Sequence, residues 1–479
     1  MRYTMHGGVV RGKTLGDANE PQIHEPPGDE MSVKFALRTT ALCASVCMAL
    51  PALALTAAGA DENASGEIPA YVGKDAPVGA WQYGKERGDF WKYKSEKPVL
   101  SIDANSAQAN AKYLTPGQLA LFKAKPGYRM DIYPSHRTCA IPDFVAANTE
   151  KNRTLAKMDD KGENVVEGVT PGFMFPKPKT GAEAIYNFIL RYAGVGTSLP
   201  TQITTVSPRP GSDEWIHAAG PTVNYTPWGV EGSKPVTGGA QLLGATTFVY
   251  TGPAALAGQG LVGRAYFSQE PETYYYFTGQ RRVRRMPAYL YDAPQLGYEN
   301  EYLVDEVGML NAPPIDRFTW KLAGKKEVYI PYNDFGMYRF NSKSEAVLGK
   351  SFINPEYRRY ELHRVYVVEA TVKASARHVA HKKVFYLDED TWLPVLAEDY
   401  DAQGQLWKVK ESYPIPVWEL GGTCDFLPFT QYDMATGRYL IDRHQFGTPK
   451  DVRWFAKPTE SWMNQEYFSA EALKTRSDR

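Results

Sequence analysis

The C-terminal half of the chain consists of short segments with strand-type alternation, and this pattern constrains the fold more than any other feature. Four such segments follow one another: RYELHRVYVVEATVK (359–373), RHVAHKKVFYLDED (377–390), TWLPVLAEDYDAQGQLWKVKESY (391–413) and FTQYDMATGRYLIDRHQF (429–446). Asp, Gly and Asn residues in the turns between them are typical of antiparallel hairpins. No long helical pattern alternates with these strands, which disfavours a parallel βαβ sheet. We therefore predict a mainly β (α+β) fold, a large curved antiparallel sheet with a few helices on one side.

Two segments ahead of the strands carry helix signals. LTPGQLALFKAKPG (114–127) places Thr115 at the N-cap and Pro116 in the first turn. TGAEAIYNFILRYAGVG (180–196) has Thr180 and Glu183 at capping-box spacing, followed by an apolar stripe. A helix with one apolar face must cover another element, so we expect these helices to pack on the sheet.

The N-terminal region predicts export. From Met31, MSVKFALRTTALCASVCMALPALALTAAGA has basic residues, an apolar run and a cleavage-type Ala-Leu-Ala at 52–54. A transmembrane anchor is the weaker alternative, because the run ends in small residues without a basic flank. We predict a non-native extension plus signal peptide over 1–54, an extended arm over 55–112, and a single domain over 113–479. The predicted location is the periplasm, with association to the outer membrane as a further possibility.

The charge balance excludes one class of partner. The chain has 54 Lys and Arg against 54 Asp and Glu, with 43% hydrophobic residues and a mean hydropathy of −0.42. A protein without an excess of basic residues lacks the net positive charge that attracts polyanions, so nucleic acid is not an expected partner.

Of the four cysteines, Cys43 and Cys47 lie in the predicted signal peptide. Cys139 and Cys424 then remain in an oxidising compartment, where two thiols can form one disulfide. The alternative is a pair of buried free thiols.

Arginines gather at RRVRR (281–285), directly after three tyrosines and a phenylalanine. On a strand, Arg282 and Arg284 share one face, and the other arginines share the opposite face. The default interpretation is a solvated strand whose arginines stack on neighbouring rings. The alternative is that Arg282 and Arg284 face the inner side of the sheet and bind an anionic head group.

A second candidate ligand surface lies on the segment 359–373. Alternation places mostly apolar side chains on one face, with a single arginine among them: Tyr360, Leu362, Arg364, Tyr366 and Val368. This face is either the wall of a ligand cavity or ordinary core, and the sequence leaves both open.

Three motifs resemble cofactor or metal sites, but the sequence around each does not predict the structure that such a site needs. GQGLVG (258–263) has dinucleotide-binding spacing but precedes a strand pattern instead of a helix. His378 and His381 would point to opposite faces of the strand that their segment predicts, so they would not chelate one ion. Asp388-Glu389-Asp390 lacks the spacing of a calcium loop. We predict no cofactor and no metal.

Common hydrolytic and redox motifs are also absent from the sequence, which favours a non-enzymatic protein. The alternative hypothesis is an enzyme that acts on a hydrophobic substrate with His363, Glu361 or Asp399 as acid or base. A third hypothesis is a structural envelope component.

Several segments together resemble the family of exported bacterial proteins known as domain of unknown function 1329 (DUF1329), which is often labelled as outer-membrane lipoprotein-sorting-like. They are LTAAGADENASGEIPAY (55–71), YLTPGQLALF (113–122), YPSHRTCAIP (133–142), FPKPKTGAEAIYNFILRYAG (175–194), TGQRRVRRMPAYLYDAP (278–294), DRFTWKLAGKKEVYIPYN (316–333), NPEYRRYELHRVYVVEATVK (354–373) and RHVAHKKVFYLDEDTW (377–392).

This resemblance implies a fold similar to that of the LolA and LolB lipoprotein carriers, an antiparallel half-barrel whose concave side is lidded by helices and holds acyl chains. It implies a lipid or another hydrophobic molecule as ligand. It also implies a partner, an outer-membrane protein or a resistance-nodulation-type transporter. It transfers no catalytic residue.

Overall fold

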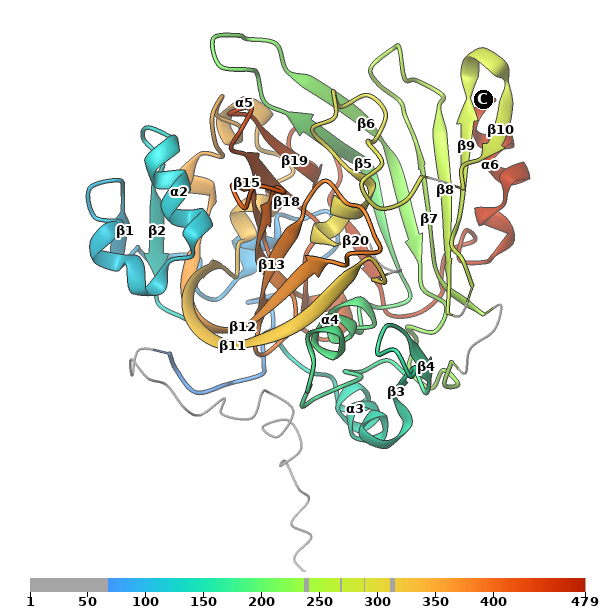
Figure 1. The fold of residues 1–479 in the computed structure, drawn as a ribbon, viewed down its shortest axis with the longest axis horizontal. Helices are drawn as coiled ribbons and strands as arrows, with labels where there is room; N and C mark the ends of the chain where they lie inside the picture. Colours follow the sequence, from blue (N-terminus) through green and yellow to red (C-terminus); the bar gives the residue numbers. More distant parts are fainter. Residues whose placement is uncertain (1–67, 237–240, 268, 288, 311–314, 479) are drawn as a thin grey trace, which may run out of the picture. The chain divides into compact units, whose positions relative to one another are not determined.

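A computed structural model describes residues 68–478 apart from 237–240, 268, 288 and 311–314. The predicted extension and signal peptide lie outside the described residues. One sheet of 16 strands dominates the rest (Figure 1). Its strand pairs are antiparallel, except that β2 and β12 run parallel. This arrangement confirms the predicted large antiparallel sheet with few helices.

The strands pair in the order β1 (Leu100–Ile102), β2 (Met130–Tyr133), β12 (Tyr360–Val372), β13 (Lys382–Asp388), β14 (Pro394–Tyr400), β15 (Leu406–Ser412), β18 (Phe429–Asp433), β19 (Tyr439–His444), β5 (Gly196–Val206), β6 (Ile216–Tyr225), β7 (Leu242–Val249), β8 (Gly260–Tyr266), β9 (Glu272–Phe277) and β10 (Arg282–Arg285). In addition, β11 (Phe318–Pro331) pairs with β12, and β20 (Arg453–Phe455) pairs with β5. Two small separate sheets are formed by β3 (Lys157–Met158) with β4 (Val165–Glu167), and by β16 (Ile415–Val417) with β17 (Thr423–Asp425).

The α-helices are α2 (Pro116–Ala124), α3 (Asp143–Leu155), α4 (Gly181–Ile189), α5 (Ser344–Val347) and α6 (Ala470–Ser477). Short 3-10 helices are η1 (Arg87–Phe90), η2 (Gln108–Tyr113), η3 (Thr278–Gln280), η4 (Val304–Met309), η5 (Phe335–Tyr338), η6 (Pro355–Tyr357), η7 (Trp418–Leu420) and η8 (Glu466–Phe468). Within the described part of the chain, no helix is long and apolar enough to cross a membrane.

The two helices predicted from sequence are confirmed, and their caps explain where they begin. The Thr115 hydroxyl accepts from the Gln118 amide at the start of α2, and the Gln118 side chain accepts from the Thr115 amide. The Thr180 hydroxyl accepts from the Glu183 amide at the start of α4. The sequence analysis did not predict α3 or α6.

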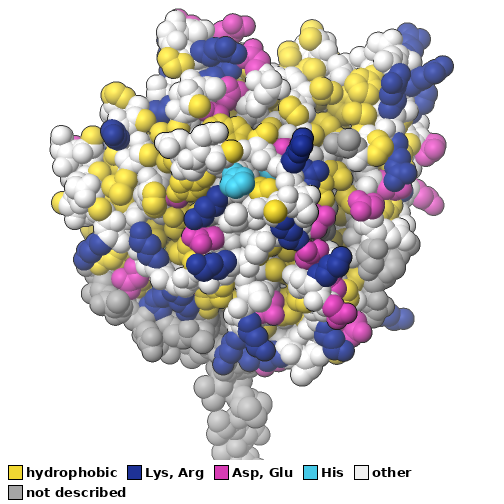
Figure 2. Space-filling view, viewed as in Figure 1, with side chains coloured by type: hydrophobic (Ala, Val, Ile, Leu, Met, Phe, Trp, Pro, Cys, Tyr) yellow, Lys and Arg dark blue, Asp and Glu magenta, His cyan; other side chains and the backbone are white. Residues whose placement is uncertain are grey.

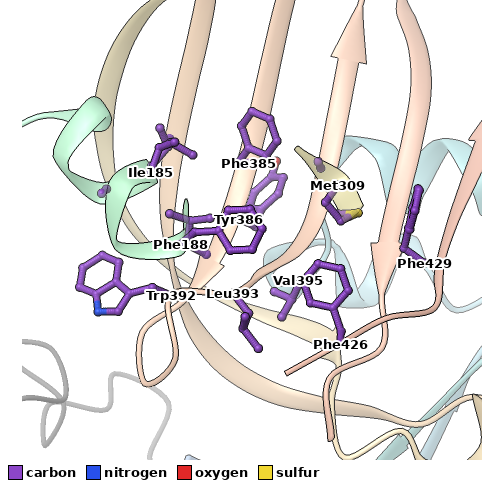
Figure 3. Packing of buried hydrophobic residues seen from close by; sticks show 14 of the residues in the cluster. Ile185, Phe188, Met309, Phe385, Tyr386, Trp392, Leu393, Val395, Phe426 and Phe429 are labelled. Carbon is purple, nitrogen blue, oxygen red and sulfur yellow. The ribbon is translucent and has the colours of Figure 1, made fainter. Parts of the chain in front are cut away.

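Helix α4 covers one end of the sheet with its apolar stripe. Ile185 and Phe188 pack in one buried cluster with Phe385 and Tyr386 of β13 (Figure 3). We call the sheet face that carries Phe385, Lys408 and Phe248 the inner face. Helix α6 packs on the outer face of β8 to β10, where its Leu473 is fully buried.

A segment that the sequence analysis did not single out lies against the inner face. We call residues 289–310, which include η4, the strap. The strap is drawn in yellow in Figure 1, between the strands β13 to β18 and the strands β5 to β9. Its two anchors are carboxylates: Glu306 Oε1 lies 2.7 Å from Lys408 Nζ, and Asp305 Oδ2 lies 2.8 Å from Lys383 Nζ.

These anchor charges are buried. The side chains of Glu306 and Lys408 are fully buried, and Gln431 Nε2 also donates to Glu306 at 3.0 Å. Burial alone would raise the pKa of Glu306, but the ammonium groups of Lys408 and Lys410 lower it to about 2. Glu306 is therefore ionised at neutral pH, and the strap is held by paired charges out of contact with water.

The N-terminal and C-terminal parts of the domain are tied covalently. Cys139 and Cys424 form a disulfide with their Cα atoms 5.1 Å apart and 285 residues apart in sequence. The described part of the predicted arm also packs on this region, because the fully buried Arg87 pairs with Glu419 and Asp451.

The strap anchor gives a stability prediction. Glu306→Gln leaves the ammonium of Lys408 buried without its counter-charge, so we expect a loss of about 3–5 kcal/mol in the free energy of unfolding. Urea unfolding followed by tryptophan fluorescence measures it. Glu167→Gln, which breaks the exposed pair with Lys157, is the matched control and should cost less than about 1 kcal/mol. Equal losses in the two variants would contradict a buried anchor.

The disulfide gives a second prediction. Closing so long a loop restricts the unfolded chain, so replacing Cys139 and Cys424 by serine should lower the free energy of unfolding by on the order of 5 kcal/mol. Adding dithiothreitol should destabilise the wild type in thermal melts and leave the double-serine variant unchanged. If dithiothreitol leaves the melting temperature of the wild type unchanged, this would contradict a stabilising disulfide.

Candidate functional site

A cavity of about 430 Å³ lies between the strap and the strands β5 to β9. Residues of three neighbouring strands form its sheet wall, and most of them alternate along their strand, which is the pattern that one face of a sheet produces. They are Gly244, Thr246 and Phe248 of β7, Leu261, Gly263 and Ala265 of β8, and Thr273 and Tyr275 of β9. Glycine, alanine and threonine leave space on this wall that larger side chains would fill.

The strap forms the opposite wall. It contributes aromatic and aliphatic side chains: Tyr289, Leu290, Tyr298, Tyr302, Val304 and Val307. With Tyr225, Tyr250 and Tyr275 from the sheet side, six tyrosines line the cavity. Burial raises the pKa of Tyr275 to about 12, so its hydroxyl remains protonated at neutral pH.

One end of the cavity is polar and preorganised. The Asp442 carboxylate accepts hydrogen bonds from the Tyr302 hydroxyl at 2.5 Å, from the Thr204 hydroxyl and from Gln202 Nε2 at 3.3 Å. The Tyr302 bond joins the strap to β19, so the two walls meet at this end. Asp442 is 1% exposed, and its three donors compensate its charge inside the protein.

Two buried polar atoms in the wall of the cavity lack a hydrogen-bond partner among the described residues. They are Gln202 Oε1 and Thr222 Oγ1. A buried polar atom without a partner costs free energy, and a ligand or a water molecule in the cavity would satisfy it. The cavity thus combines aromatic side chains with many polar ones, so it suits a molecule that has both apolar and polar parts.

The predicted ligand face of β12 lies elsewhere, in packed core. Tyr360 and Leu362 are buried in a cluster that includes residues of α2, whereas Tyr366 and Val368 are buried in the cluster under α4. Arg364 lies 3.6 Å from Glu389. None of these five residues lines the 430 Å³ cavity. Other side chains pack around these residues, and ligand binding by this face stays a prediction.

The arginine cluster lies at the free edge of the sheet. Arg282 and Arg284 of β10 pair with Phe277 and Tyr275 of β9, so they share the face that carries Tyr275. Both are exposed, and neither lines the cavity. Figure 2 shows Lys and Arg side chains gathered at the edge that β9 and β10 form. Arg282 and Arg284 therefore lie on the inner face in contact with solvent, and their binding of an anionic head group stays a prediction.

Two of the three acid and base residues of the enzyme hypothesis lie together, and all three are buried. Glu361 Oε2 lies 3.1 Å from His363 Nε2, but both side chains are at most 1% exposed and neither lines the cavity. Asp399 pairs with Lys410 at 2.6 Å, away from His363. Glu361 and His363 are within hydrogen-bond distance of each other, but a substrate in this cavity would not contact them.

His363 also lies close to Asp388 and Asp390, with one ligand atom of each residue within 4.8 Å of the others. Arg137 donates to both oxygens of Asp390, so this carboxylate already has a cationic partner. The sequence analysis placed His378 and His381 on a strand, and that placement is wrong. Both precede β13 in a loop, where His378 Nε2 lies 2.8 Å from Asp305 Oδ2 and supports the strap.

The sequence carried only a weak signal for the cavity. Residues 246–252 (TTFVYTG) and 260–270 (GLVGRAYFSQE) have a composition typical of strands, but nothing in it indicates that their small residues face a hollow. The strap has no strand or helix periodicity, and Asp442 and Arg443 lie within the predicted strand segment 429–446, where nothing in the pattern sets them apart. Asp442 and Arg443 lie close to Thr204, which is more than 200 residues earlier in the sequence, because β19 pairs with β5.

A pH prediction follows from the buried acidic cluster. Burial, followed by the charge of Asp390, raises the pKa of Asp388 to about 7. The folded protein therefore retains a proton that the unfolded chain releases from about pH 4 upward. This group lowers stability as the pH rises from about 4 to 7, with no further effect above 7.

Asp388→Asn removes this dependence, so wild type should lose stability relative to the variant across that window. Thermal melts of both proteins at several pH values between 4 and 8 measure it. The exposed Asp160→Asn variant is the control for removing a carboxylate. If the melting temperatures of wild type and Asp388→Asn change with pH in the same way, this would contradict a raised pKa of Asp388.

Three solved structures share features of this fold. The first is a putative outer membrane lipoprotein-sorting protein domain from Vibrio parahaemolyticus, 15% identical, with a TM-score of 0.39, covering 59% of this chain and 92% of that chain. A DUF1329 family protein from Desulfovibrio piger is 13% identical, with a TM-score of 0.37, covering 58% and 92%. The LolA superfamily protein NE2245 from Nitrosomonas europaea is 11% identical, with a TM-score of 0.34, covering 60% and 100%. At these TM-scores we draw no functional conclusion from them.

Sequence comparison assigns the chain more directly. It is 35% identical over 399 residues to the uncharacterized protein PA3922 of Pseudomonas aeruginosa, a match that covers 81% of this chain and 84% of the relative. The family model described as protein of unknown function (DUF1329) matches residues 101–474. The chain therefore belongs to the DUF1329 family.

Proposed function

We propose that this protein binds a hydrophobic or amphipathic small molecule in the cavity between the strap and strands β5 to β9, without chemical conversion. The observation that supports this most strongly is the cavity itself, which has about 430 Å³ of space and six tyrosines in its wall. This volume falls within the range of small-molecule sites.

The physical benefit is the removal of apolar surface from water. Each methylene transferred from water to an apolar wall contributes roughly 0.8 kcal/mol, so a chain of several methylenes is strongly favoured inside. Phe248, Leu261 and Val307 offer such a wall, and the tyrosine rings add flat apolar faces with hydroxyl groups at their tips.

The setting that we propose is the periplasm. The signal-peptide pattern before Leu55 and the Cys139–Cys424 disulfide support an oxidising, exported location. A carrier there would exchange its ligand with an outer-membrane protein or a resistance-nodulation-type transporter, as the family resemblance suggests.

A binding titration tests the cavity. The neutral probe N-phenyl-1-naphthylamine should gain fluorescence on binding to wild type, with saturation at one molecule per chain. Ala265→Trp places a large ring on the sheet wall of the cavity and should weaken probe binding by more than about ten-fold, because the ring takes the space of the ligand.

Ala435→Trp is the matched control, because it adds the same ring at an exposed turn between β18 and β19. Its affinity for the probe should equal that of wild type. A wild type that ignores the probe, or an Ala265→Trp variant that binds as tightly as wild type, would exclude this cavity as the site.

A further inference from the structure

The strand β19 carries a bulge at the polar end of the cavity. Ile441 pairs with Thr205 and His444 pairs with Ile203, so Asp442 and Arg443 both lie opposite Thr204. Arg443 has a φ of 57°, in the left-handed region that non-glycine residues seldom adopt. A bulge of this kind redirects a side chain, and here two consecutive residues, Asp442 and Arg443, both line the cavity.

The guanidinium of Arg443 has unused donors. It donates no hydrogen bond to any residue from the described ranges, and its closest charged atom is Asp442 Oδ2, 3.8 Å from Nε. Both Asp442 oxygens already accept from neutral donors on Thr204, Gln202 and Tyr302. Arg443 is 21% exposed, so its charge is neither fully solvated nor hydrogen-bonded within the protein.

The other two arginines of the cavity wall differ in this respect. Arg191 donates to Asp425 and to the Phe188 carbonyl. Arg264 donates to the carbonyls of Phe468 and Gln465. Their guanidinium groups donate within the fold, whereas Arg443 has an uncommon backbone conformation and its guanidinium donates no hydrogen bond to the described residues, with only the Asp442 carboxylate 3.8 Å away. Strained residues of this kind are typical of ligand sites.

We propose that Arg443 binds the oxyanion of an acidic amphiphile, a carboxylate or a phosphate, whose apolar chain lies on the aromatic wall. A planar guanidinium with several free donors matches two oxygens of such a group at once. The Thr222 hydroxyl, which also lacks a partner among the described residues, is a further donor on the cavity wall. This assignment rests on the proposed function and adds the chemical class of its ligand.

Displacement of N-phenyl-1-naphthylamine by three probes with the same chain tests it: dodecanoate, dodecyl phosphate and 1-dodecanol, with the full chain at pH 7.5. Wild type should bind at least one of the two anions about ten-fold or more tighter than the alcohol, because hydrogen bonds between charged partners are the stronger ones. The anion that binds more tightly identifies the head group as carboxylate or phosphate.

Arg443→Gln should abolish the preference for the anion and retain the affinity for 1-dodecanol. Arg443→Gly removes the guanidinium at a φ that glycine adopts freely, so it gives the same test in a backbone without strain. Arg264→Gln is the control: it removes an arginine of β8 whose guanidinium donates to the carbonyls of Phe468 and Gln465, and it should keep the preference.

The outcomes separate the two claims. If wild type binds the neutral probe and 1-dodecanol but shows no preference for an anion, or if Arg443→Gln and Arg443→Gly keep that preference, the role of Arg443 is wrong while the binding function stands. If wild type binds none of the four compounds, the binding function is wrong, and the assignment of Arg443 is wrong with it.

Discussion

The pairing of two strap carboxylates with lysines on the inner face is the interaction on which the site depends. Glu306 and Asp305 reach Lys408 and Lys383 at 2.7 and 2.8 Å, and these contacts fix the strap against the sheet. Ammonium groups on the inner face of a curved sheet would be unfavourable without such partners. With the strap fixed there, its other side supplies the aromatic wall of the cavity. Charge pairing on one side of the strap thus positions the wall of a cavity on the other.

The sheet then divides into two functional parts. Around β12 to β14 the inner face is filled by α4 and by side chains such as Trp392 and Phe426, so this part is solid core (Figure 3). Around β5 to β9 the inner face carries glycine, alanine and threonine opposite the strap, and the space stays open. The first part is filled by packed side chains, whereas the second leaves space for a ligand.

Much of the fold could be predicted from the sequence because its signals are local. Alternation and turn residues predicted the sheet, and the caps at Thr115 and Thr180 predicted two helices. The site could not be predicted in the same way. The apolar face from Tyr360 to Val368 has the strongest pattern, but a strong apolar pattern is equally a property of packed core. The cavity depends on small residues, on a strap without periodicity and on a bulge at Arg443, and these meet only through long-range pairing.

The most direct test of the account is to locate a bound hydrophobe by photo-crosslinking. A fatty acid with a diazirine on its chain would be irradiated with the protein, and labelled peptides would be identified by mass spectrometry. We predict labels on β7 and β8 and on the strap around Tyr298 to Val307, and we expect these labels to be lost when unlabelled fatty acid is added in excess. Labels confined to the outer face or to the segment from Tyr360 to Val368, with none on the strap, would contradict it.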